Sequence, residues 1–115
     1  MSPAILAAVA SPRRREILRL VWNDELTAGA IHAAMPDITF GAVSLQLKTL
    51  LEAGLVEART ESRNRIYRAR REALGPIGEM LEHTWNDALA RLKIRAELDE
   101  SRRGPRPLNK KGRKP

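Results

Sequence analysis

The groups best suited to chemistry lie between residues 39 and 48, and the chemistry they offer is non-covalent. If Val43, Leu47, Leu50 and Leu51 form the buried stripe of a helix, its other side presents mostly hydroxyl, apolar and ammonium groups. These outward positions are Thr39, Phe40, Gly41, Ser44, Leu45 and Lys48, with Gln46 toward the side. Such groups at the amino-terminal end of a helix suit the major groove of double-stranded DNA.

Each of these side chains has a specific use in that interpretation. Hydroxyl groups can hydrogen-bond phosphates or bases, Gln46 can pair with adenine, and Phe40 and Leu45 can contact thymine methyl groups. Gly41 would allow a close approach, and Lys48 fits a phosphate contact. Core packing suits Phe40 equally well, and a solvated helix face is the alternative for Ser44 and Lys48.

A second candidate surface is a run of arginines between residues 59 and 71, which holds six Arg and one Glu. Arg63 and Arg65 are expected near the tip of a hairpin, with Arg59 and Arg68 beside them. Arginine in such a place suits the phosphate backbone or the minor groove, whereas a charged solvent face is the ordinary alternative.

Catalytic and metal chemistry have little support in the sequence. It has no cysteine, which excludes disulfides, thiolate nucleophiles and thiolate metal ligands. The only histidines are His32 and His83, and no Ser-His-acid order, phosphate-binding glycine loop or paired-histidine helix motif is present. We therefore expect neither an enzyme nor a bound cofactor or metal.

Three helices would position the first candidate surface. Ser11-Pro12 is typical of a helix start, and Asn23-Asp24 would end that helix. Thr27 would cap a short helix through Ala34, ended by Pro36. Thr39 would cap the next through about Ala53, with Gly54 as the left-handed stop. Two helices joined by residues 35–38 form the plan of a helix-turn-helix.

Strand-like sequence follows the third helix. Residues 55–59 and 65–68 are expected to pair as a hairpin around a polar turn at residues 60–64, in which Asn64 would take the unusual backbone angles. A hairpin directly after such a helix is a wing. The expected fold is mainly α with a small β-hairpin wing, a winged helix-turn-helix.

Two apolar helices have too little chain around them to be buried by it. One spans residues 3–10, and the other opens at Gly75-Pro76, runs through about Leu98 and is roughly 35 Å long. Both are expected to pack against a second copy of the chain, which makes the fold dimeric. The predicted interface residues are Ile5, Leu6, Val9, Leu81, Trp85, Leu89 and Leu92.

Composition sets the domain organisation. The chain has 115 residues and a net charge of +7, and its 14 acidic residues and 14 of its 21 basic residues precede residue 101. We expect one domain over residues 1–100 and a disordered basic tail over residues 101–115. No apolar run reaches the roughly 18 residues that span a bilayer, and the short apolar amino terminus lacks the preceding charge of an export signal. A cytoplasmic protein is expected.

The stretch from Ser11 to Ala69 resembles the ArsR/SmtB family of winged-helix repressors. The matching pieces are residues 11–18 (SPRRREIL), 25–27 (ELT), 42–48 (AVSLQLK), 52–56 (EAGLV) and 65–68 (RIYR). Their order and spacing are more specific than any one of them. The long helix with Trp85 is similar to the terminal dimerisation helix of a metal-independent branch of the family.

Departures from the family pattern bear on its known functions. The family commonly has histidine where Gln46 stands, aspartate where Ser11 stands and glycine near Ser62. Its metal-sensing members use cysteines in the helix that begins here at Thr27, or paired histidines and acids on the terminal helix, where this chain has His83 and Asp87. Metal sensing therefore does not carry over. If a small-molecule effector exists, the apolar groove near Trp85 is its expected place.

Three functions fit the sequence. The leading hypothesis is a sequence-specific regulator, a homodimeric repressor on a palindromic operator. The alternatives are a nonspecific architectural nucleic-acid binder that acts through charge, and a protein-interaction module that kept the scaffold and lost DNA binding. A large ratio between the affinity for one site and that for other DNA indicates the sequence-specific regulator, and a ratio near one indicates the architectural binder. Weak DNA affinity even at low salt indicates the protein-interaction module.

The basic tail is either a solvated end or an arm that follows DNA phosphates. If it is an arm, deletion of residues 101–115 removes phosphate contacts and flattens the salt dependence of DNA binding, measured by fluorescence anisotropy. An unchanged slope would contradict the arm.

Overall fold

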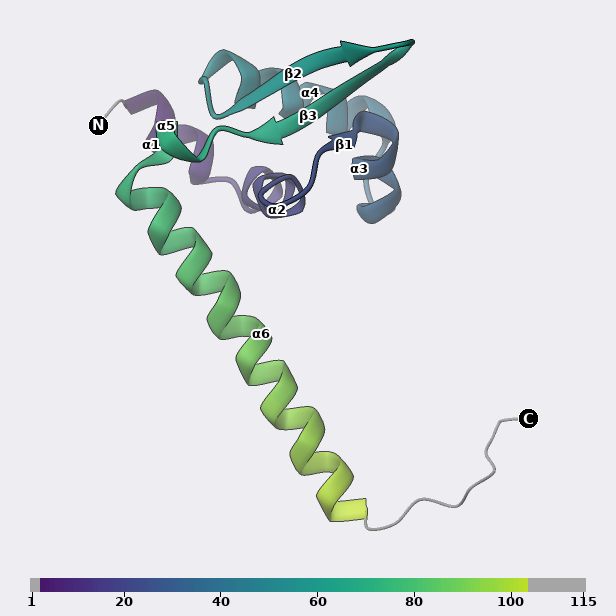
Figure 1. Cartoon of the computed structure of the whole chain (residues 1–115), viewed down its shortest axis with the longest axis vertical. Helices are drawn as coiled ribbons and strands as arrows, with labels where there is room; N and C mark the ends of the chain where they lie inside the picture. The colour runs from purple at the N-terminus through teal and green to yellow at the C-terminus, as the bar shows by residue number, and fades with distance from the viewer. Residues whose placement is uncertain (1–2, 104–115) are drawn as a thin grey trace, which may run out of the picture. The chain divides into compact units, whose positions relative to one another are not determined.

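The computed structural model describes the backbone of residues 3–103 and the side-chain surroundings of residues 3–98. The chain divides into one compact unit up to Glu82 and a second from His83, and each is described by itself (Figure 1). Its elements are α1 (Pro3–Val9), α2 (Pro12–Leu20), β1 (Leu26–Thr27), α3 (Ala28–Ala34), α4 (Phe40–Glu52), β2 (Val56–Glu61), β3 (Asn64–Ala69), α5 (Arg71–Leu74) and α6 (Pro76–Arg103).

Hydroxyl side chains start the three helices of the first unit as the sequence predicts. Ser11 Oγ accepts from the backbone N–H of Arg14 at 3.3 Å. Thr27 and Thr39 do the same for the residues three positions on, at 3.1 and 3.0 Å. Each bond satisfies a backbone donor that the first turn of a helix leaves unpaired. The predicted starts of α2, α3 and α4 are therefore confirmed.

Gly54 ends α4 in the left-handed conformation, with φ 76°. The N–H of Leu55 donates to the Leu50 carbonyl and that of Gly54 to the Leu51 carbonyl, both at 3.0 Å, which is a Schellman motif. The chain thereby turns directly into β2. After the end of β3, the N–H of Arg70 donates to the carbonyl of Leu55 at 2.8 Å. This bond fixes the base of the hairpin beside the end of α4.

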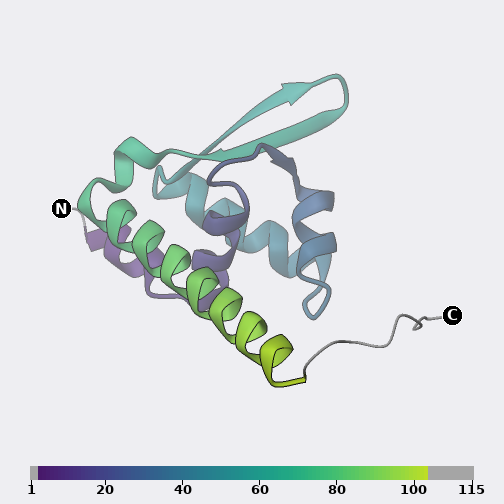
Figure 2. The ribbon, with the colours of Figure 1, turned by 60° about the horizontal axis from the view of Figure 1, so that its bottom comes forward.

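The wing is a three-stranded antiparallel sheet in the order β1-β3-β2, with β1 a strand that the sequence did not reveal. β1 has only two residues, and they pair with Tyr67 and Ile66 of β3. Two residues are too few for an alternating pattern, and the sequence indicates for Thr27 only its role as the cap of α3. Figures 1 and 2 show the sheet beside the helices, with its turn reaching away from them.

The hairpin turn differs from the sequence prediction. β2 pairs with β3 up to Glu61 and Asn64, which leaves a two-residue turn at Ser62-Arg63. Ser62 takes the positive φ, 58°, and Asn64 lies in the strand. The five-residue turn with Asn64 as its special residue is therefore wrong, because a turn this tight matches the twist of the two strands best when its first residue has positive φ.

The core of the first unit lies among α2, α3, α4 and the sheet. Its fully buried large side chains are Ile17, Leu18, Val21, Ile31, Val43, Leu47, Leu50, Leu55 and Leu74. Val43, Leu47 and Leu50 are the predicted stripe of α4, whereas Leu51 is only half-buried. One side of α4 is thus anchored in the core, and its opposite side is free.

Other bounds also differ from the predictions. α2 ends at Leu20 with Val21 as its cap, three residues before Asn23-Asp24. The short helix α5 was not predicted. α6 continues to Arg103, past the expected end near Leu98 and three residues into the predicted tail. The rest of that tail, residues 104–115, lies outside the described residues.

The turn at Ser62 gives a stability prediction. Ser62→Gly should raise the free energy of unfolding by about 0.5 kcal/mol, because glycine adopts positive φ without the steric cost of a Cβ. Asn64→Gly is the matched control: it places glycine in a strand and should lower the same quantity by about 0.5–1 kcal/mol. Urea unfolding measures both, and equal destabilisation by the two variants would contradict the turn.

Candidate nucleic-acid interface

The turn between α3 and α4 is fixed by two polar contacts and one ring contact. His32 Nε2 donates to the carbonyl oxygen of Ile38 at 3.0 Å. The His32 ring meets the ring of Phe40 edge-on, with centroids 5.8 Å apart. Arg13, on the first turn of α2, forms an ion pair with Asp37 at 2.5 Å. These contacts fix where α4 begins relative to the helices behind it.

The free side of α4 carries the residues expected there. Thr39, Gly41, Ser44 and Lys48 are exposed. The same surface holds two large apolar side chains, with Phe40 49% and Leu45 62% exposed. The first turn of α4 contains no acidic residue that would repel a polyanion, and the carboxylate of Asp37 in the preceding turn is paired with Arg13. Thr39 uses one lone pair of its hydroxyl oxygen as the helix cap, which leaves the proton and the second lone pair for an outward contact.

Gln46 differs from the other predicted contacts. Its Oε1 accepts a hydrogen bond from Arg14 Nη1 at 3.0 Å, and its side chain is half-buried. The same arginine donates to the carbonyls of Ala8 at 2.8 Å and Ala7 at 3.1 Å, which cap the end of α1. Arg14 therefore joins α1, α2 and α4, and the Gln46 amide is part of that link.

The arginines of the hairpin fall into two groups. Arg63 lies exposed in the two-residue turn, and Arg65 lies in β3 with its guanidinium 5.6 Å from the ring centre of Tyr67. Within the part of the chain that the structure describes, no carboxylate is within ion-pair distance of either. The positive charge of both is therefore uncompensated at the outer end of the hairpin.

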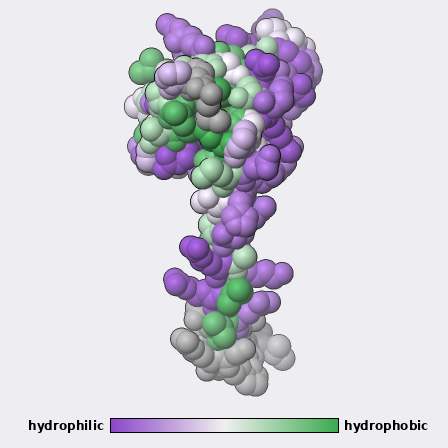
Figure 3. Space-filling model, turned by 90° about the vertical axis from the view of Figure 1, so that its left-hand side faces the viewer, coloured by the Kyte–Doolittle hydropathy of each residue, from purple (hydrophilic) through white to green (hydrophobic). Residues whose placement is uncertain are grey.

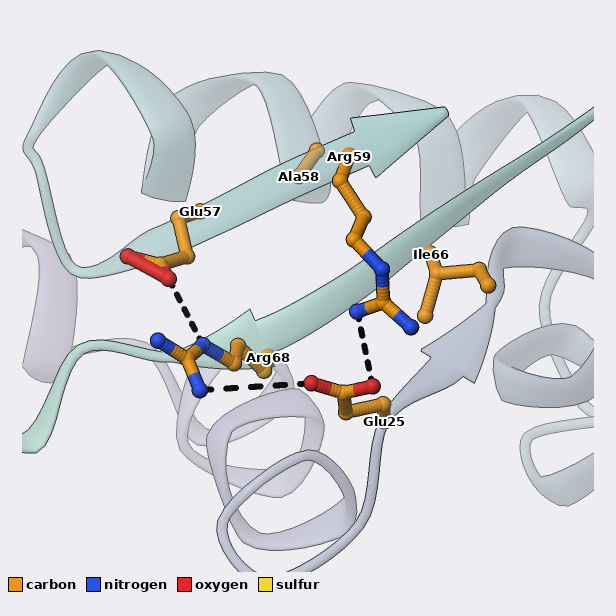
Figure 4. A pocket seen from close by; sticks show the side chains of 6 residues that line it. All are labelled: Glu25, Glu57, Ala58, Arg59, Ile66 and Arg68. Carbon is orange, nitrogen blue, oxygen red and sulfur yellow. Dashed lines mark hydrogen bonds and ion pairs between the residues drawn. The ribbon is translucent and has the colours of Figure 1, made fainter. Parts of the chain in front are cut away.

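Arg59 belongs to the other group. Its guanidinium pairs with Glu25 at 2.7 Å, and Arg68 pairs with Glu57 at 2.6 Å (Figure 4). Arg59 also pairs with Glu61 at 3.1 Å. A recess of about 510 Å³ on the outer face of the sheet is lined by Glu25, Glu57, Ala58, Arg59, Ile66 and Arg68. The hydrogen bond that Arg59 donates to the Glu25 carboxylate is the main cause that raises the pKa of Arg59 above its ordinary value. Arg59, predicted as a DNA contact, is thus engaged by carboxylates of its own chain.

The number of arginines in residues 59–71 therefore overestimates the net positive charge on this part of the surface. Arg70, too, has carboxylates of Glu57 and Glu72 within 3.9 and 3.7 Å. Glu25 and Glu57 lie outside residues 59–71, and the pairing of the strands brings them close, whereas Glu72 follows Arg70 by two residues. Of the predicted wing contacts, Arg63 and Arg65 keep the surroundings that a phosphate contact needs.

The predicted interface residues are partly exposed. Leu6 of α1 is 52% exposed, and Leu89 and Leu92 of α6 are 65% and 63% exposed. The half-buried members are Ile5, Val9, Leu81 and Trp85. Three further exposed apolar residues of α6 were not predicted: Met80, Ile94 and Leu98. Figure 3 shows hydrophobic side chains exposed among hydrophilic ones on α6.

Trp22 makes contacts with α5 and the start of α6 that the sequence does not reveal. The Trp22 indole N–H donates to Glu82 at 2.9 Å, and the Arg71 guanidinium lies 5.2 Å from its ring centre. Arg71 also donates to the Trp22 carbonyl at 2.7 Å and to the Asn23 amide oxygen. The sequence pattern gives no indication of these partners of Trp22, which lie 49 and 60 residues away along the chain.

The described residues offer neither a metal-binding cluster nor a membrane-spanning helix. Among them, no three histidine, cysteine or acidic side chains are grouped so as to hold a metal ion. His83 and Asp87 form a pair at 3.4 Å. None of the described helices combines the length and the apolar character needed to cross a membrane.

The fold and the free side of α4 define a winged helix-turn-helix domain. Residues 9–59 match the family model of the helix-turn-helix domain. No curated protein sequence matches the chain significantly.

Solved structures match over a larger part of the chain. A "possible transcriptional regulator for arsenical resistance" is 32% identical with TM-score 0.61, over 81% of this chain and 96% of that one. HlyU from Vibrio cholerae is 27% identical with TM-score 0.64, over 71% and 88%. The homodimeric DNA-binding domain of Mb0332 from Mycobacterium bovis, a possible ArsR-family regulator, is 28% identical with TM-score 0.63, over 76% and 81%.

The chain belongs to the ArsR/SmtB-type winged helix-turn-helix family. Its fold and its relatives are those of DNA-binding transcriptional regulators and not of enzymes. The predicted family and fold are confirmed. The individual DNA contacts, the dimer interface and the single domain over residues 1–100 stay predictions.

The Arg13–Asp37 pair gives a testable pKa. The hydrogen bond from Arg13 is the main cause that lowers the pKa of Asp37 below its ordinary value. A carboxyl whose pKa falls on folding adds stability above its unfolded pKa and loses it as the pH falls through the folded value. Arg13→Gln should therefore raise the pKa of Asp37 in an NMR titration of its carboxyl group. Arg19→Gln is the control and should leave it unchanged, and an equal Asp37 pKa in wild type and Arg13→Gln would contradict the pairing.

Proposed function

We propose that the protein is a sequence-specific transcriptional repressor that binds a palindromic operator as a homodimer. In this proposal α4 enters the major groove with Phe40, Gly41, Ser44 and Leu45 toward the bases. Lys48 contacts a phosphate. The observation that carries the proposal is the free side of α4, which is exposed, free of acid in its first turn and anchored from behind. A major groove admits one α-helix, and phosphate contacts fix its orientation.

The hairpin supplies the second contact. Its outer end holds Arg63 and Arg65, whose charges have no carboxylate partner among the described residues, and guanidinium groups in that place suit phosphates or the minor groove. Arg59 is withdrawn from this role by Glu25 and Glu61. The proposed wing contact therefore consists of the turn and the start of β3.

Dimerisation is proposed through α1 and α6. The exposure of Leu6, Leu89 and Leu92 supports it, because large apolar side chains are seldom left open on a helix without a partner. The related Mb0332 domain is homodimeric. A twofold dimer places two recognition helices about one helical turn of DNA apart, which a palindromic site matches. As a regulator of bacterial type it would act on DNA in the cytoplasm.

An effector near Trp85 stays a prediction. A change in tryptophan fluorescence on titration with candidate metabolites would support it. A flat titration across them would contradict it.

The proposal is tested by fluorescence anisotropy of the full-length protein on DNA from upstream of its own gene and on a scrambled duplex. Tight binding to the upstream duplex alone is expected. Arg63→Ala should weaken binding to every duplex and reduce the slope of log affinity against log salt by about one, since one phosphate contact is lost. Arg59→Ala, the matched control on the same hairpin, should leave that slope unchanged.

Two outcomes would contradict the proposal. Equal affinity for both duplexes would favour the architectural alternative, and weak binding to both even at low salt would favour the protein-interaction module. Equal losses of slope from Arg63→Ala and Arg59→Ala would place the outer face of the sheet against DNA and contradict the proposed wing.

A further inference from the structure

The exposed side of α4 between residues 40 and 48 has few groups that can recognise a base by paired hydrogen bonds. Specific contacts of that kind come mainly from Arg or Lys to guanine and from Asn or Gln to adenine. From residue 40 to residue 48, α4 has no Arg and no Asn, and Gln46 and Lys48 are its only residues of these types.

Gln46 is not available for such a contact. A paired contact to adenine requires the glutamine oxygen to accept from the base while its nitrogen donates. That oxygen already accepts from Arg14 at 3.0 Å, and Arg14 is itself held by two carbonyls at the end of α1. To reach a base, Gln46 would have to give up this bond.

Two hydroxyl groups are also in use. Thr39 accepts from the N–H of Ala42 as the cap of α4, and Thr49 donates to the carbonyl of Leu45 at 3.2 Å. Ser44 stays exposed, but a hydroxyl pairs with several bases and discriminates little between them. The polar atoms of the first turns of α4 therefore carry little information about sequence.

The apolar atoms are different. Leu45 lies two residues after Val43 and two residues before Leu47, a spacing of about 200° around the helix. Because Val43 and Leu47 are buried in the core, Leu45 points away from it. It is 62% exposed. Phe40 is 49% exposed, and the edge-on contact with His32 holds its ring at the start of the helix. In the major groove only thymine presents an apolar group, its methyl.

We infer that α4 reads its half-site through thymine methyl groups, with Leu45 as the specificity-determining residue and Phe40 as a second apolar contact. This inference rests on the proposed function, because it assumes that α4 enters the major groove. Arg14 is a positioning residue in this account, since it holds Gln46 away from the bases.

The test begins with the full-length protein and a pool of random duplexes. The bound fraction should be enriched in one sequence whose half-sites contain thymines at fixed positions. Each of these thymines is then replaced by uracil, which removes the methyl group and leaves all hydrogen-bonding atoms in place. Loss of one buried methyl contact should weaken binding about three- to fivefold.

Two variants identify the side chain responsible. Leu45→Ala should bind the thymine and uracil duplexes equally at the position that Leu45 reads. Because Leu45 is exposed and outside the core, the variant should keep the fold, which circular dichroism checks. Lys48→Met is the matched control on the same helix. It should weaken binding to both duplexes by the same factor and keep the thymine-to-uracil ratio.

The outcomes separate this inference from the proposed function. Enrichment of one sequence with no effect of uracil would overturn the methyl reading and leave the sequence-specific regulator intact. Weaker binding to 7-deazaadenine duplexes but not to uracil duplexes would overturn it as well, in favour of adenine contacts by Gln46. No enrichment of any sequence would overturn both.

Discussion

The anchoring of α4 from one side determines how the rest of the first unit is built. Val43, Leu47 and Leu50 are buried, and burial of an aliphatic side chain of this size is worth about 1.5–3 kcal/mol. α4 packs on α2, α3 and β2, all from behind. Since the apolar stripe is on one side only, the opposite side needs no partner from this chain and is open to DNA.

Polar contacts then set the position of this helix more precisely than the core can. Arg13 ties the α3–α4 turn to α2 through Asp37, and Arg14 ties α4 to α1 through Gln46. Exposed ion pairs contribute little stability, about 0–1 kcal/mol. Their role is therefore better described as geometric: they connect α1 and the turn to the helix that meets the bases.

Local sequence patterns predicted most of the fold because each is decided within a few residues. Ser11, Thr27 and Thr39 cap helices that start where they stand, and Gly54 ends α4. β1 escaped prediction because two residues carry no period. The turn was misplaced because its geometry depends on the register of the strands, which put Ser62 and not Asn64 at the positive φ.

The candidate site was predictable on α4, where exposure depends on local sequence, and less so on the hairpin, where the contacts are long-range. Exposure of Leu45 follows from the helical period, but Arg14, which holds Gln46, and Glu25, which pairs with Arg59, each lie more than thirty positions from their partner. A count of arginines along residues 59–71 cannot include Glu25 or Glu57. Long-range pairing therefore decides which charges remain free, and only the structure gives it.

The central claim is that α4 and the hairpin turn form the surface that meets DNA. Backbone amide NMR shifts of the full-length protein, followed during titration with its selected duplex, test it most directly. The account predicts the largest shifts at residues 39–48 and 62–65, with small shifts at Glu25, Glu57 and Arg68. Large shifts on that outer face of the sheet, with α4 unaffected, would contradict it.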